Sequence, residues 1–184
     1  MLAGSLSVAE GVLILLNPGY YGFDSALDSF VLFVEGAALI SLLGGLAGLH
    51  VRQAGSYGRL GVAGFLAAFS GTSLAGAGHI AGLPFFDFVN VGGVVYVVFT
   101  LRSGFLPLWG VVYVAGIVLM SAGTIAVGIA TMRARSLTVW SGPVLVGGLV
   151  GLWVAGNAGG WVLFGLAWLG VGYAMLPAKD ATPR

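Results

Sequence analysis

Cysteine and charge are what this sequence has least of. None of its 184 residues is a cysteine, which excludes disulfides, thiolate metal ligands and thiol redox chemistry. Charged residues make up only 7% of the chain, whereas soluble domains carry roughly 25%. A net charge of +1 also argues against a nucleic-acid partner, because phosphate binding needs clustered Lys and Arg. The chain is therefore not expected to be a soluble domain.

Apolar residues dominate instead, at 59% of the chain with a mean hydropathy of +1.06. A helix needs about 20 apolar residues to cross a ~30 Å hydrocarbon core. Residues 30–49 and 60–78 meet that length on either side of a short turn that carries Arg52 and Arg59. The sequence thus predicts a polytopic membrane protein that forms a single transmembrane helical domain over residues 1–184, with the lipid bilayer as its surroundings.

The apolar runs predict an all-α integral membrane protein with six transmembrane helices. They cover residues 2–16, 30–49, 60–78, 108–132, 139–155 and 161–176. We interpret the first run as a retained helix and not a signal peptide, because it lacks a basic start and contains Glu10. Residues 83–102 are apolar but interrupted by Pro84 and by Gly92-Gly93, which predicts a broken or re-entrant segment. Seven transmembrane helices are the alternative.

The positive charges favour six spans over seven. With six, all but one of the basic residues lie on one side of the membrane: Arg52, Arg59, Arg133, Arg135, Lys179 and Arg184. With seven, the basic residues are split between the two sides. The positive-inside rule then places the N-terminus in the cytoplasm.

Glycine is unusually frequent, with 33 residues. Small residues let helices in lipid approach closely. Pairs spaced by four residues occur at Gly44/Gly48, Gly147/Gly151 and Gly156/Gly160. We interpret them as packing contacts within the chain, with a dimerisation motif as the alternative.

Two glutamates lie inside predicted membrane helices, where an ionisable group costs on the order of 3 kcal/mol or more. At a rise of 1.5 Å per residue, Glu10 and Glu35 lie roughly 7 to 11 Å below the outer surface. Neighbouring antiparallel helices can bring them together. Two adjacent carboxylates in a low dielectric cannot both ionise at low cost, so such a pair shares a proton or holds a cation. The alternative is that each is protonated and hydrogen-bonded to a serine such as Ser7 or Ser41.

The broken segment supplies further candidates on the same outer side. Asp87, Asn90 and Arg102 are expected near the mouth of an outward-facing pocket, among aromatic residues that suit a cation. The alternative is an ordinary aromatic belt with solvated acids. His50 and His79 are expected about 30 Å apart, across the bilayer, and cannot share a metal or haem. We therefore expect no metal and no cofactor.

These residues predict a protein that binds or passes a small apolar or cationic ligand. One alternative is an intramembrane enzyme that modifies a lipid or isoprenoid, using a buried carboxyl as general acid. Another is a structural subunit that packs as a homo-oligomer or against a membrane-protein partner, through its glycine-rich faces. No motif identifies a substrate.

Three stretches resemble a broad group of small polytopic membrane proteins of high-GC bacteria that have no assigned activity. The stretches are GLHVRQAGSYGRLGVAGFLAAF, IATMRARSLTVWSG and FGLAWLGVGYAML. The resemblance implies a multi-pass protein of the bacterial inner membrane and agrees with six spans. It carries over no catalytic residue.

Overall fold

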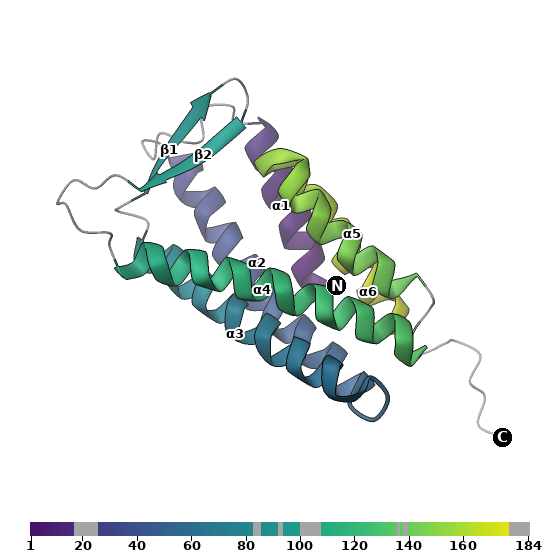
Figure 1. The fold of residues 1–184 in the computed structure, drawn as a ribbon. Helices are drawn as coiled ribbons and strands as arrows, with labels where there is room; N and C mark the ends of the chain where they lie inside the picture. Colours follow the sequence, from purple (N-terminus) through teal and green to yellow (C-terminus); the bar gives the residue numbers. More distant parts are fainter. Residues whose placement is uncertain are drawn as a thin grey trace.

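A computed structural model describes residues 1–16, 26–82, 86–91, 94–99, 108–135, 137 and 140–176 of the chain. Six helices and one pair of strands make up the fold in these residues (Figure 1). Their bounds are α1 Leu2–Leu16, α2 Ala26–Gln53, α3 Gly58–Gly82, β1 Phe86–Val91, β2 Val94–Phe99, α4 Leu108–Ala134, α5 Ser141–Val154 and α6 Gly156–Ala174. The predicted helical class is confirmed.

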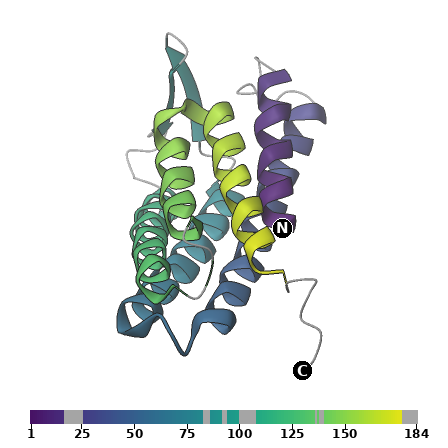
Figure 2. The same cartoon turned by 90° about the vertical axis from the view of Figure 1, so that its right-hand side faces the viewer.

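The helices form a closed ring in which each packs against the next and α6 returns to α1 (Figures 1 and 2). Neighbours in the ring run antiparallel: Gly64 of α3 faces Ala126 of α4, whereas Gly71, two turns later, faces Met120. The end of α3 and the start of α4 therefore lie at the same end of the bundle.

Glycines bring two helix pairs, α1–α6 and α3–α4, into close backbone contact. An added Cβ at Gly71 would lie 2.1 Å from the Met120 nitrogen, and one at Gly4 would lie 2.6 Å from the Gly165 oxygen. The glycines in these contacts are spaced by seven residues, as Gly4/Gly11, Gly64/Gly71, Gly116/Gly123 and Gly165/Gly172. Seven residues are about two helical turns, so each pair forms one stripe that lets the facing backbone approach.

The four-residue spacing singled out in the sequence is only partly used for internal packing. A Cβ at Gly151 or Gly160 would meet the neighbouring helix of the α5–α6 pair. By contrast, nothing lies within 4 Å of a Cβ built at Gly44, Gly48 or Gly147. For these three glycines the predicted packing within the chain is wrong, because they face away from the bundle.

Leucine and aromatic side chains fill the middle of the ring. Leu46 and Leu49 of α2 are buried against Phe164 and Trp168 of α6 in one apolar cluster. Phe164 and Trp168 contact each other edge to face, with ring centroids 6.3 Å apart. The same cluster also includes buried residues of the other four helices, so the core is shared by the whole ring.

The segment expected to be broken or re-entrant contains an antiparallel β-hairpin. Phe86 pairs with Phe99 and Val91 pairs with Val94, so the described residues 86–91 and 94–99 form strands and not the seventh helix of the alternative. Valine and aromatic residues favour strands, and the two residues between the strands are Gly92 and Gly93, a hairpin-turn signal. The hairpin and the α2–α3 turn lie at opposite ends of the molecule (Figures 1 and 2).

Three helices of the described chain are long and apolar enough to cross a membrane. They are Phe33–Gln53, Gly58–Ala77 and Val111–Ala134. The helices α1 and α5 have 15 and 14 residues, fewer than the roughly 20 that a full crossing needs. In α6 the apolar stretch is Ala158–Ala174. Length and composition therefore suit three helices of the described chain to a membrane crossing, and they do not establish six crossings.

Candidate functional site

Two carboxyl groups are buried inside the ring. The Glu10 side chain on α1 is 0% exposed and the Glu35 side chain on α2 is 8% exposed. One turn away on the same helix faces, Ile14 and Val31 belong to a single buried cluster with Trp161 packed against it. The helices α1 and α2 are neighbours in the ring. The structure therefore brings the two predicted glutamates to the interior of one helix pair.

The two carboxyl groups also interact electrostatically, because the charge of Glu35 acts on Glu10. Both Glu10 oxygens are buried without a hydrogen-bond partner among the described residues. Ser7, one turn earlier and also buried, does not bond to them, so the alternative of a serine-held carboxyl is wrong for Glu10. Glu35 does make a polar or electrostatic contact. We define Glu10 and Glu35 as the carboxyl pair.

Tyr113 of α4 is a third member of the site that sequence reasoning missed. Its phenol lies within electrostatic range of both Glu35 and Glu10. In the sequence, Tyr113 is one aromatic residue in a long apolar run, and no local signal separates it from a core tyrosine. Only the ring arrangement, which places α4 across from α1 and α2, reveals it.

Two of the other predicted site residues lie on the hairpin. Asp87 and Asn90 belong to β1, where they pair with Val98 and Val95 of β2. Arg102 lies outside the described residues. Their assignment to the mouth of a pocket stays a prediction.

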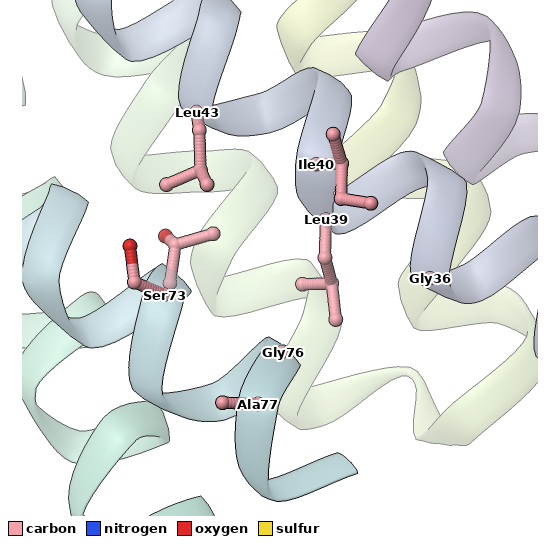
Figure 3. Close-up of a pocket in the computed structure, with 8 residues that line it drawn as sticks. Gly36, Leu39, Ile40, Leu43, Ser73, Gly76 and Ala77 are labelled. Carbon is pink, nitrogen blue, oxygen red and sulfur yellow. The ribbon is translucent and has the colours of Figure 1, made fainter. Parts of the chain in front are cut away.

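An apolar groove lies elsewhere, between α2 and α3 (Figure 3). It has a volume of about 180 Å³ and is lined by Gly36, Leu39, Ile40, Leu43, Thr72, Ser73, Gly76 and Ala77. Ile40 is 66% exposed, so the groove opens sideways from the bundle. Neither glutamate of the carboxyl pair lines it. It is therefore distinct from the outward-facing pocket that the sequence predicted around those glutamates.

A second polar cluster holds the α2–α3 turn at the opposite end from the hairpin. Nδ1 of His50 is hydrogen-bonded to the Tyr57 hydroxyl, and the His50 ring stacks on Phe65 with centroids 4.1 Å apart. The Thr131 hydroxyl donates to Oε1 of the fully buried Gln53 at 3.0 Å. These bonds tie the end of α2 to the turn and to α4.

Tyr57 gives this cluster a pH dependence. Burial raises the pKa of its phenol, and an unfolded tyrosine has a pKa of about 10. The stability that the protonated Tyr57 contributes is therefore fully present below pH ~10. It is lost as the pH rises through the pKa of Tyr57 in the folded state. Tyr57→Phe is expected to lower the free energy of unfolding by about 1 kcal/mol at neutral pH and to reduce the loss of stability at alkaline pH. Unfolding measured across this pH range in both proteins tests this, and an identical alkaline loss in the variant would contradict it.

Histidine and acidic side chains do not gather into a metal centre among the described residues, since no group of three or more is positioned to hold an ion. Comparison of the chain with protein-family models, with curated proteins and with solved structures finds no match.

Proposed function

We propose that the protein crosses the bacterial inner membrane six times, with its N-terminus in the cytoplasm. The antiparallel ring supports this, because an even number of crossings places both ends of the bundle's chain on one side. Arg52, Arg59, Arg133 and Arg135 are exposed at that same end. An excess of Arg near helix ends is typical of the cytoplasmic side.

Single cysteines test this topology directly, since the natural chain has none. Ala54, in the α2–α3 turn, and Ala155, between α5 and α6, are both exposed. A membrane-impermeant maleimide applied to intact spheroplasts should label Ala155→Cys and should label Ala54→Cys only after permeabilisation. Labelling of both from the same side would contradict the six-span arrangement.

We propose that the protein binds or passes a small cationic ligand at the carboxyl pair. The observation that carries this proposal is the pairing of two buried carboxyl groups, one of which has two unpartnered oxygens. Intramembrane ionisable groups are costly and mark ion and substrate sites. A cation or a shared proton removes the cost of placing two carboxylates side by side in a low dielectric.

The proposed site is formed by side chains from three helices, α1, α2 and α4. Glu10 and Glu35 provide negative charge, and the Tyr113 hydroxyl provides a neutral polar group near both. The carboxyl pair holds a proton when no other cation is bound, and the incoming cation replaces that proton. Tyr113 orients the carboxyl groups and does not carry charge.

Native mass spectrometry of the gently purified protein tests the proposal. We expect a bound cation in the wild type and its loss in the Glu10→Gln, Glu35→Gln double variant. Ser7→Ala is the matched control, because Ser7 is buried on α1 one turn from Glu10 but carries no charge. Retention of the same ligand in the double variant would refute the site.

A second candidate function, a subunit of a larger membrane assembly, is favoured by the outward-facing glycines. Gly44 and Gly48 on α2 and Gly147 on α5 leave open space at the surface of the bundle, and small residues mark helix contacts in lipid. A stable partner or second copy that co-purifies with the wild type and is lost on Gly44→Leu would support it. The lipid-modifying enzyme stays an untested alternative.

A further inference from the structure

The α2–α3 groove lies within the apolar stretches of both helices, toward the hairpin end. Its α3 wall runs from Thr72 to Ala77, and the apolar stretch of α3 ends at Ala77. At 1.5 Å per residue, the wall covers about the last 8 Å of that stretch. Both helices are among the three that are long and apolar enough to span a membrane. With these two helices across the membrane, as proposed above, lipid chains surround the mouth of the groove.

The groove offers an occupant no free hydrogen-bond donor. Its two hydroxyl groups are already used within α3: Thr72 Oγ1 donates to the Ala68 carbonyl at 2.8 Å, and Ser73 Oγ donates to the Phe69 carbonyl at 2.9 Å. None of the lining residues is charged. The remaining surface is aliphatic, and Figure 3 shows Leu39 and Leu43 extending from α2 toward α3. A polar ligand would gain nothing here.

Glycine keeps the groove open and sets its size. A Cβ at Gly36 would meet nothing within 4 Å, and one at Gly76 would reach only ordinary contact with Leu39 at 3.9 Å. The volume of about 180 Å³ is close to that of apolar cavities of about 150 Å³ that bind one benzene-sized molecule. A whole helix, roughly 10 Å across, does not fit. A segment of one hydrocarbon chain, about the size of that molecule, does.

We propose that this groove binds one acyl chain of a membrane lipid from the leaflet on the hairpin side. The chain lies between Gly36 and Ile40 of α2 and Ser73 and Ala77 of α3, while its headgroup stays at the interface. This inference rests on the proposed membrane topology but not on the carboxyl pair, because neither glutamate lines the groove. It assigns the groove a role in holding lipid and not in cation binding.

Photo-crosslinking tests the proposal. The protein is reconstituted into phosphatidylcholine vesicles that contain a trace of phosphatidylcholine with a diazirine in one acyl chain, and adducts are mapped by peptide mass spectrometry. We expect adducts on the groove residues to exceed those on the rest of the lipid-facing surface. Gly36→Leu fills the groove from α2, and Ser73→Leu fills it from α3. Each should reduce the groove adducts about tenfold, because the chain loses its buried contacts.

Ala63→Leu is the matched control, since it adds a leucine to α3 at an exposed position more than two helical turns before Thr72 and outside the groove. It should leave the groove adducts unchanged, and so should the Glu10→Gln, Glu35→Gln variant. Adducts spread evenly around the bundle, or groove adducts that survive both filled variants, would overturn the proposal. Crosslinks between two protein copies at the groove would overturn it as well, because a second copy would then occupy the groove.

Discussion

Replacing Gly71 by alanine is expected to lower the free energy of unfolding by about 3 kcal/mol, the upper part of the usual range for overpacked cores. The added Cβ would lie 2.1 Å from the nitrogen and 2.6 Å from the Cα of Met120. Both are backbone atoms, which cannot rotate out of the way as the end of a side chain can. The helices α3 and α4 must therefore separate. Separation would also weaken the neighbouring contact between Gly123 and Ala68.

Thermal unfolding in detergent, followed by circular dichroism, measures this effect. Gly44→Ala is the control, because its Cβ points into open space and alanine is a better helix former than glycine by up to about 1 kcal/mol. The control variant should be as stable as the wild type or more stable. If Gly71→Ala had the same melting temperature as the wild type, the backbones of α3 and α4 would not be in close contact at this position.

Glu10→Gln is expected to weaken cation binding by about 100-fold, as expected when one partner of a buried charged group is lost. Glutamine keeps the shape of the side chain but cannot carry the negative charge that balances the ligand. Glu35→Gln should have a similar effect. The double variant should lose less than the two single losses added together, because groups that interact directly give non-additive effects.

Isothermal titration with the co-purified cation, or with monovalent cations from sodium to tetramethylammonium, measures these affinities. Ser7→Ala controls for changes in the packing of α1. Tyr113→Phe should weaken binding less than either glutamine variant, since it removes a hydroxyl and no charge. Strictly additive losses for the two glutamates would indicate that they act at separate places.

The carboxyl pair could be predicted because a charge in an apolar run is a strong signal. Glu10 and Glu35 interrupt otherwise apolar sequences, and their similar depth on successive helices follows from counting residues at a fixed rise. Tyr113 could not be found in this way, because a tyrosine is ordinary in such a run. Its place in the site depends on which helices meet across the ring, which is a property of the tertiary structure.

The glycine contacts show a similar limit. The sequence shows both four-residue and seven-residue spacings, but it does not say which stripe faces another helix. Gly44 and Gly48 have the more familiar spacing and face outward, whereas Gly64 and Gly71 pack against α4. Packing between helices sets how each helix is rotated about its own axis. The spacing of the glycines does not reveal that rotation.

The hairpin was missed for a different reason. Residues 83–102 are apolar enough for a membrane helix, and hydropathy alone gives no sign of strands. Strands are instead indicated by the valine and aromatic content of residues 86–99 and by the two glycines at the centre of this range. The lengths of α1 and α5 also depart from six full crossings, and residue composition does not fix where a helix ends.

Proton release during cation binding tests the central claim most directly. The purified protein is placed in weak buffer with a pH indicator, and the bound cation is added. If the carboxyl pair holds a shared proton that the cation replaces, the wild type releases protons as the site fills, whereas the Glu10→Gln, Glu35→Gln variant releases none. Cation binding without proton release, at equal affinity in both proteins, would contradict the assignment of the site to Glu10 and Glu35.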